Sequence, residues 1–352
     1  MLRVDVKKRL GNFRLDVSFE ASSGTLALLG ASGCGKSVTL KCIAGIEKPD
    51  AGRIELNGRV LFDSALGVNL PPRARRVGYL FQQYSLFPNM TVAQNVLLGV
   101  RLEHRARRRE IAAQMLAAMR LTGLENKRPA QLSGGQQQRT ALARILVSEP
   151  ELLLLDEPFS ALDDYLKWQV ELELSDTLKA FGGTSVFVSH SRDEVYRLCE
   201  NVCVLTDGRS ERADTVRGLF TSPGTLSACL ISGCKNYTRA RVLGAGRVEA
   251  LDWGVTLRVP DAPPGTAYLG VRAHHVAPCA PSESGAENTV PCRVTRVVED
   301  VFSTVVMLAT PGGDTEFSRL RMELPKERWA ALGAPETLTV QIRENDILPL
   351  KK

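Results

Sequence analysis

Residues 28–45, LLGASGCGKSVTLKCIAG, combine glycine, lysine and serine at a spacing that can bind phosphate. Gly30, Gly35, Lys36 and Ser37 match the pattern G-x-x-x-x-G-K-[ST]. Glycines let the backbone turn tightly, so that successive N–H groups form an anion nest, and a helix that follows adds its positive N-terminal dipole. Lys36 would neutralise the β- and γ-phosphates, and the Ser37 hydroxyl would bind Mg²⁺. The loop predicts a site for ATP or a similar nucleoside triphosphate.

A glycine turn that merely carries Lys-Ser is the alternative to this prediction. The flanking residues favour the phosphate site, because an apolar run at 24–30 predicts a strand and residues 36–46 have the apolar spacing of a helix. The loop residues expected to contact the nucleotide are Gly30, Ala31, Ser32, Gly33, Cys34, Gly35, Lys36, Ser37 and Val38.

A second set of residues that could take part in catalysis lies in the segment 151–158, ELLLLDEP. Four consecutive leucines are typical of a parallel strand that is covered on both faces, and the run ends in two acids. Asp156 would hold Mg²⁺ through water, and Glu157 would accept a proton from the water that attacks the γ-phosphate. Two acids could also simply begin a turn, but a phosphate loop in the same chain favours the catalytic interpretation.

Two more apolar runs end in a polar side chain. VGYLFQ, residues 77–82, ends at Gln82, which could reach Mg²⁺ and the attacking water. TSVFVSH, residues 184–190, ends at His190, which could hydrogen-bond the γ-phosphate and hold Glu157 and its water in line. The catalytic residues are therefore expected to be Lys36, Gln82, Glu157 and His190, and the metal-binding residues Ser37, Gln82 and Asp156.

The octapeptide LSGGQQQR, residues 132–139, predicts another anion-binding helix start. Ser133 is a good N-cap, and Gly134 and Gly135 expose backbone N–H groups ahead of a helix that reaches about residue 147. Residues 160–163 end in Asp163, which would cap a further helix.

These residues need elements that bring them together. Apolar strands that alternate with helical patterns predict a parallel sheet, and the strand ends that carry the site residues are expected at one edge of that sheet. The predicted fold class is therefore α/β, of the P-loop NTPase type.

Length and composition limit the possible number of domains, the partners and the location of the chain. A chain of 352 residues is long enough for two domains. Its formal net charge of +6 is spread along the sequence, which favours no nucleic acid partner. The 8 cysteines show no C-x-x-C pair, as expected of free thiols in a reducing cytoplasm. We find no signal peptide and no apolar run of about 20 residues, so the chain is expected to be soluble and to serve any membrane from outside the bilayer.

Taken together, the motifs resemble the nucleotide-binding subunit of an ATP-binding cassette (ABC) transporter, over about residues 1–220. Residues 30–37 resemble Walker A, Gln82 the Q-loop, 132–136 the signature motif, 152–157 Walker B, 160–163 the D-loop and His190 the switch histidine. The resemblance implies a homodimer of cassettes in which each ATP lies between one Walker A and the partner's signature motif. It thereby adds Ser133, Gly134, Gly135, Gln136 and Asp163 to the expected nucleotide site.

Within that family, the stretch GRVLFDSALGVNLPPRARRVGYLFQQYSLFP is similar to molybdate-importer ATPases, and less to sulfate and ferric-ion relatives. The resemblance implies an ATPase that powers oxyanion import, most directly of molybdate, from the cytoplasmic face of the membrane. A permease would dock near Gln82–Pro88, and an extracytoplasmic binding protein would deliver the solute. Importers of sulfate, thiosulfate, ferric ion or another small solute, a soluble non-transport ABC ATPase and a nucleotide sensor remain the alternatives.

One segment departs from the family pattern. Many members stack adenine on an aromatic residue shortly before the first core strand, but here that position falls at Arg9 or Leu10 in KKRLGNFRLDVSF. Phe13 is the nearest aromatic residue, and the alternating pattern through Val17 and Phe19 could equally bury it.

A change in pattern near residue 225 predicts a second domain. We expect the cassette at 1–225, with a helical subdomain at about 84–148, and at 226–352 a small β-barrel, because short alternating strands are separated there by Gly, Pro and Ser. VRAHHVAP at 271–278 and IRENDILP at 342–349 suggest an internal duplication. The region resembles the TOBE/Mop-like barrel of oxyanion and sugar importers, which could bind the transported oxyanion and inhibit, or brace the dimer.

Overall fold

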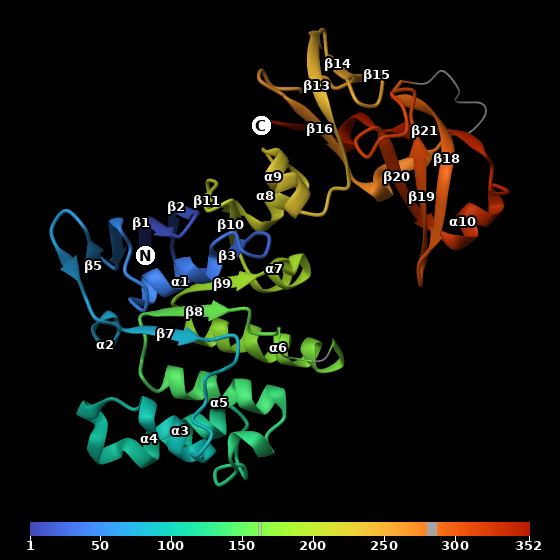
Figure 1. Ribbon diagram of the computed structural model, residues 1–352. Helices are drawn as coiled ribbons and strands as arrows, with labels where there is room; N and C mark the ends of the chain where they lie inside the picture. The colour runs from blue at the N-terminus through green and yellow to red at the C-terminus, as the bar shows by residue number, and fades with distance from the viewer. Residues whose placement is uncertain (161, 163, 280–286) are drawn as a thin grey trace. The chain divides into compact units, whose positions relative to one another are not determined.

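The computed structural model describes residues 1–160, 162, 164–279 and 287–352 (Figure 1). The chain divides into two compact units, Met1–Val216 and Arg217–Lys352. The expected boundary after residue 225 falls between two short helices, α8 (Val216–Thr221) and α9 (Leu226–Ile231).

A parallel sheet forms the centre of the first unit. Its strands are β3 (Gly24–Leu29), β7 (Val77–Leu80), β8 (Leu152–Asp156), β9 (Thr184–Ser189) and β10 (Asn201–Thr206). They lie in the order β10-β3-β9-β8-β7, and each pairs in parallel with its neighbour. Every residue of β8 and β9 is buried, as expected of strands covered on both faces. The loops that follow β3, β7, β8 and β9 therefore meet at one edge of the sheet.

Mostly antiparallel strands extend this sheet on the far side of β10. They are β1 (Leu2–Leu10), β2 (Phe13–Ala21), β4 (Ala51–Leu56), β5 (Arg59–Asp63), β6 (Val68–Asn69), β11 (Arg209–Ser210) and β12 (Asp214–Thr215). Buried and exposed residues alternate along β1 and β2, so one face of this part is apolar.

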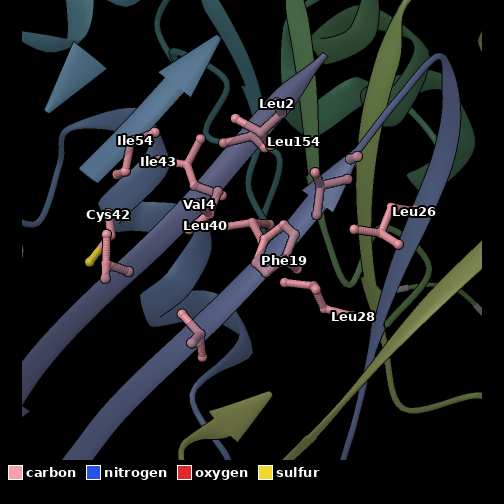
Figure 2. Close-up of a cluster of buried hydrophobic side chains, with 14 of the residues drawn as sticks. Leu2, Val4, Phe19, Leu26, Leu28, Leu40, Cys42, Ile43, Ile54 and Leu154 are labelled. Carbon is pink, nitrogen blue, oxygen red and sulfur yellow. The ribbon is translucent and has the colours of Figure 1, made fainter. Parts of the chain in front are cut away.

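The apolar face covers α1 (Lys36–Ala44), the helix that begins at the phosphate loop. Figure 2 shows the shared core, to which β1 contributes Leu2 and Val4, β2 Phe19, α1 Leu40 and Ile43, and β8 Leu154. Because α1 is packed against both parts of the sheet, the loop before it is held in place from several sides.

A buried arginine fixes the other end of α1. Arg75 ends the short helix α2 (Pro72–Arg75), and its Nη1 donates to the carbonyls of Cys42 and Ile43, at 2.8 Å each. These carbonyls belong to the last turn of α1, which lacks the regular helical donors, and the Cys42 carbonyl also accepts from the N–H of Gly45 at 3.2 Å. Burial lowers the pKa of Arg75, but the guanidinium remains a cation at neutral pH.

Helices between β7 and β8 form a separate cluster. They are α3 (Val92–Gly99), η1 (Leu102–Arg107), α4 (Arg108–Ala118), η2 (Pro129–Gln131) and α5 (Gly134–Leu146). Their apolar faces share one core, around Val92, Val96, Leu116 and Leu121. The remaining helices, α6 (Asp164–Phe181) and α7 (Arg192–Leu198), follow β8 and β9.

Among its described residues, the second unit contains two sheets of five strands each. One has the order β15-β14-β13-β16-β22 and the other β17-β21-β18-β19-β20. Both face a common core that surrounds Trp253, whose side chain is completely buried. The elements are β13 (Asn236–Gly244), β14 (Arg247–Ala250), β15 (Val255–Arg258), β16 (Tyr268–Val271), β17 (Val276–Pro278), β18 (Thr289–Glu299), β19 (Ser303–Ala309), β20 (Arg319–Pro325), α10 (Lys326–Ala331), β21 (Thr337–Ile342) and β22 (Ile347–Leu350).

The two similar octapeptides have the same role in this unit. Each runs from the end of one strand through a single 3₁₀ turn, η3 (Ala273–His275) or η5 (Glu344–Asp346), into the other sheet. As a result β16 pairs with β22, and β17 with β21. The repeat in the sequence is thus a pair of equivalent crossovers between the sheets.

No helix in the described part of the chain is both long enough and apolar enough to span a bilayer.

Candidate functional site

The loop between β3 and α1 requires glycine at two positions. At Gly30 a β-carbon would lie 2.3 Å from the carbonyl oxygen of Leu205, and at Gly35 it would lie 2.5 Å from Leu15. Gly35 also has a φ of 106°, which is strained for any residue with a side chain. The backbone of the loop is therefore held close to the protein core, with its other side free for a ligand.

Lys36 lies across this loop. Its side chain is buried, and Nζ donates to the carbonyls of Gly30, at 2.7 Å, and Ala31, at 2.9 Å. The ammonium group is thus positioned over the nest at the N-terminus of α1, where an anion is favoured by both the charge and the helix dipole.

Ser37, the next residue, is hydrogen-bonded to an acid from the neighbouring part of the sheet. Its Oγ donates to Oδ1 of Asp156 at 2.8 Å, and the phenol of Tyr79 donates to Oδ2 of Asp156, also at 2.8 Å. Asp156 ends β8 and is 6% exposed, so its carboxylate is fixed at both oxygens. Burial first, and then the nearby Asp156 carboxylate, raise the pKa of Tyr79 far above its usual range, so the phenol is a neutral donor.

This arrangement fits Mg²⁺. A serine hydroxyl and a carboxylate side by side are hard oxygen donors, the kind that Mg²⁺ binds together with substrate phosphates. Gln82, the third expected metal-binding residue, is exposed in the turn after β7. Within the described residues, no hydrogen bond joins Gln82 to Ser37 or Asp156, so the structure brings together two of the three.

Glu157 and His190 meet beside this group. The His190 Nδ1 lies 3.6 Å from Oε1 of Glu157, where β9 and β8 end. Glu157 has a left-handed φ of 46°, and its N–H donates to the carbonyl of Val188 at 3.0 Å. The backbone turn directs the carboxylate away from the strand and toward the histidine side of the sheet edge.

A buried network holds the residues on either side of His190. The Ser189 Oγ donates to Oε2 of Glu194 at 2.6 Å and accepts from the N–H of Ser191 at 2.9 Å. Glu194 is itself buried, and its other oxygen pairs with Lys167 of α6. The backbone on either side of His190 is therefore held by α6 and α7, while the His190 side chain itself is exposed.

The second predicted anion site lies at the start of α5. Ser133 and Gln136 form a reciprocal capping box, in which the Ser133 Oγ accepts from the Gln136 N–H, and the Gln136 side chain accepts from the Ser133 N–H. In the parts of the chain described here, no hydrogen bond or ion pair joins residues 133–136 to the phosphate loop. Asp163 lies outside the described residues, whereas Ser160 donates to the carbonyl of Glu157 at 2.9 Å.

The candidates for adenine stacking differ in their surroundings. Arg9 and Leu10, at the end of β1, are exposed. Phe13 is half-buried and packs against the core around α1, and a β-carbon at Gly35 would lie 3.0 Å from its ring. Phe13 therefore packs against the phosphate loop. Arg9 and Leu10 remain the candidates nearest the position at which many family members stack adenine.

The described part of the second unit has a polar cavity in which acids accompany the arginines. A cavity of about 660 Å³ is lined by Arg296, Arg319 and Arg321, and also by Glu299, Asp300 and Asp314. Arg319 is paired with Asp314 at 2.6 Å. The acids offset the arginines, so oxyanion binding in the second unit stays a prediction.

Tyr79 and Glu194 are the residues that our sequence analysis did not identify. Tyr79 could have been noticed, because it is a hydroxyl-bearing residue in a half-buried parallel strand and lies two residues before the end of its apolar run. Glu194 had no comparable signal, since an acid in the first turn of a helix is ordinary.

Known proteins resemble this chain in sequence and in structure. A family model described as "ABC transporter" matches residues 15–160. The molybdenum import ATP-binding protein ModC of Paramagnetospirillum magneticum is 35% identical over 90% of each chain. The ferric-ion import ATP-binding protein FbpC of Brucella abortus is 38% identical over 81% of this chain and 82% of its own.

A third relative is the spermidine/putrescine import ATP-binding protein PotA of Nitratidesulfovibrio vulgaris, 41% identical over 69% of this chain and 66% of its own. Among solved structures, a dimeric, post-hydrolysis ATP-binding cassette bound to ADP and Pi matches with a TM-score of 0.52 and 30% identity, over 62% of this chain and all of that one.

Proposed function

Because the chain belongs to the ATP-binding cassette (ABC) transporter family, as an importer ATPase, we propose that it powers uptake of an oxyanion, specifically molybdate. The supporting observation is the extent of the match to the molybdenum importer, which includes most of the second unit as well as the cassette. The polyamine importer matches at higher identity but over a smaller share of the chain. A cassette alone would not distinguish between these cargoes, because all the relatives share its chemistry.

In this proposal the loop Gly30–Val38 holds the phosphates of ATP. Lys36 exchanges its bonds to the loop carbonyls for bonds to the β- and γ-phosphates, which compensate its charge better. Ser37 and Asp156, with Gln82 from the turn after β7, would hold Mg²⁺. When bound, Mg²⁺ neutralises charge on the phosphate oxygens and aligns them for in-line attack.

Hydrolysis would then depend on the pair at the ends of β8 and β9. Glu157 accepts a proton from the attacking water, and His190 hydrogen-bonds the γ-phosphate and keeps Glu157 in line. Gln82 would help to orient the same water. These residues act chiefly by positioning and by neutralising charge, which accounts for most of the catalysis of phosphoryl transfer.

The cassette would work as a homodimer. Ser133, Gly134, Gly135 and Gln136, which form a helix start apart from the phosphate loop, would bind the nucleotide of the partner copy, and Asp163 would lie at the same interface. Permease subunits would dock near Gln82–Pro88 at the cytoplasmic face of the membrane, and an extracytoplasmic binding protein would supply the solute. Residues 226–352 would form a regulatory domain of the TOBE/Mop-like kind.

The cargo is tested by ATP hydrolysis in the assembled transporter. The chain is reconstituted with its permease, and binding protein is added after loading with molybdate, sulfate, ferric ion or spermidine. We expect molybdate-loaded protein to raise the hydrolysis rate. Stimulation by a different cargo would reassign the substrate, and no stimulation by either oxyanion would remove the oxyanion proposal while leaving the ATPase intact.

The shared site is tested by mixing two inactive chains. Lys36→Ala and Ser133→Arg should each abolish hydrolysis in a homodimer, since each damages both sites. A mixed dimer retains one complete site, with Lys36 from one chain and Ser133 from the other, and activity should partly return. If mixing restores nothing although mixed dimers form, the two motifs do not share a nucleotide.

A further inference from the structure

The phenol of Tyr79 donates a hydrogen bond to Asp156, and the proposed chemistry gives this tyrosine no role. We propose that Tyr79 is a positioning residue for Mg²⁺: it fixes one oxygen of Asp156, so that the other oxygen stays beside Ser37. This inference rests on the proposed function, because it takes Ser37 and Asp156 as the Mg²⁺ site.

Strand register explains how Tyr79 reaches the acid. In the parallel pair of β7 and β8, Tyr79 lies opposite Leu154. Residues 154 and 156 are on the same face of β8, because side chains alternate along a strand. The long tyrosine side chain leans along the strand to Asp156, and a shorter side chain at position 79 could not span that distance.

The ring of Tyr79 is well suited to hold a fixed direction. It packs against the buried cluster around α1, and its centroid lies 4.2 Å from the ring of Phe81. A ring held on both sides cannot turn freely, so the hydroxyl is aimed at Oδ2 of Asp156. Ser37, by contrast, belongs to α1 and bonds Oδ1. Two elements therefore share the carboxylate, one oxygen each.

The division of the two oxygens matters for binding a metal. Ser37 and Oδ1 of Asp156 are hydrogen-bonded to each other beside the phosphate loop, and there they would hold Mg²⁺. Without the phenol, Oδ2 would be a buried acceptor with no donor, and the carboxylate could rotate toward Ser37 or draw in water. Donors that orient a metal-binding carboxylate in this way typically change metal affinity by about tenfold or more.

The experiment compares Tyr79→Phe with Tyr268→Phe in the full chain. Each substitution removes one phenolic oxygen and keeps the ring. Tyr268 is half-buried like Tyr79, but it lies in β16 of the second unit and takes no part in the proposed Mg²⁺ site. Hydrolysis is measured at saturating ATP over a range of Mg²⁺ concentrations. Binding of Mn²⁺ in the presence of a non-hydrolysable ATP analogue is followed by electron paramagnetic resonance.

We expect Tyr79→Phe to raise the half-saturating Mg²⁺ concentration by about tenfold and to weaken Mn²⁺ binding similarly. Its maximal rate at saturating Mg²⁺ should stay within about twofold of the unaltered chain, because the chemical groups are still present. Tyr268→Phe should leave the metal dependence unchanged.

Equal metal dependence in Tyr79→Phe and the unaltered chain would overturn the inference, as would a lower maximal rate without weaker metal binding. Failure of the proposed function has a different signature. In that case the unaltered chain itself would hydrolyse no ATP, or would do so with no requirement for Mg²⁺ and no effect of Lys36→Ala.

Discussion

Glu157 is the residue on which the proposed chemistry depends most directly. Its carboxylate lies 3.6 Å from His190, at the end of the strand that also carries Asp156. A carboxylate can accept a proton from water, whereas an amide of nearly the same shape cannot.

Glu157→Gln should therefore lower the rate of ATP hydrolysis by about 100-fold or more, the contribution typical of a general base, and leave ATP binding intact. Phosphate release and the affinity for a fluorescent ATP analogue are measured on the same preparation. Glu47→Gln is the control, since Glu47 pairs with Lys8 at the surface. Hydrolysis at the normal rate in Glu157→Gln would assign the base to another residue.

At this scale, the sequence predicts best those residues that have special backbone or charge requirements. The need for glycine at positions 30 and 35 follows from the loop geometry that was expected of the pattern. Tyr79 was missed because its role depends on strand register, which places it one strand away from Asp156 and 77 positions earlier in the chain. Spacing within one segment does not contain that information.

Among the elements, α1 has the most demanding position, because it carries the phosphate loop and is buried along most of its length. Its last turn is capped from outside by Arg75, which donates to Cys42, Ile43 and Leu70. Removing this buried donor takes away the side-chain partner of the Ile43 and Leu70 carbonyls, whereas the Cys42 carbonyl keeps the N–H of Gly45.

Arg75→Met keeps much of the side-chain volume and should lower the free energy of unfolding of the cassette by about 2–4 kcal/mol. Urea denaturation followed by circular dichroism would measure the loss. Arg73→Met, at an exposed position of the same short helix, should change stability by less than about 0.5 kcal/mol. Similar stabilities of the two variants would show that the cap contributes little.

Asp252, in the second unit, predicts that the stability of this unit depends on pH. Burial alone would raise the pKa of Asp252, but hydrogen bonds from Arg239 and Thr238 outweigh it and hold that pKa below the usual value. A lowered pKa means that the folded state favours the carboxylate. The stabilisation is thus complete above the unfolded pKa of about 3.9 and is lost as the pH falls through the folded value.

Asp252→Asn should make the second unit less stable at pH 7 but less sensitive to acid below about pH 4. Thermal unfolding at a series of pH values, compared with that of the unaltered chain, tests both halves of this expectation. Curves that stay parallel down to the lowest pH would mean that Asp252 does not contribute to the acid response.

The α/β P-loop fold, the helices between β7 and β8 and the small C-terminal β-barrel were all predicted correctly from periodicity and family resemblance. Less could be predicted about the pairing of the β-strands in the second unit. The two crossovers at η3 and η5 exchange strands between the sheets, and their partners are distant in sequence. A local pattern identifies a strand but not its neighbour.

At the scale of the whole molecule, the family and the ATPase activity that we expected are confirmed by the comparisons. The two units also have separate apolar cores, one around α1 and one around Trp253. Because each unit buries its own apolar surface, each is expected to unfold as its own cooperative transition.

Trp253→Ala should lower only the transition of the second unit, by about 3–5 kcal/mol, and Leu40→Ala only that of the cassette, by about 2–5 kcal/mol. Trp253→Phe should cost less, because it keeps most of the volume and removes an indole N–H that has no hydrogen-bond partner within the described residues. Calorimetry of the full chain would separate the transitions. A single transition shifted equally by both alanine variants would show that the units unfold together.

The backbone of Glu157 has a consequence for anyone who engineers this chain. A left-handed conformation suits glycine or asparagine better than glutamate, and is worst for branched side chains such as valine. Selection of random variants for heat resistance would thus enrich glycine or asparagine at position 157. These variants would lose ATP hydrolysis. At position 157 the residue that supports hydrolysis therefore lowers thermal stability, so a screen for more stable variants must also measure ATP hydrolysis.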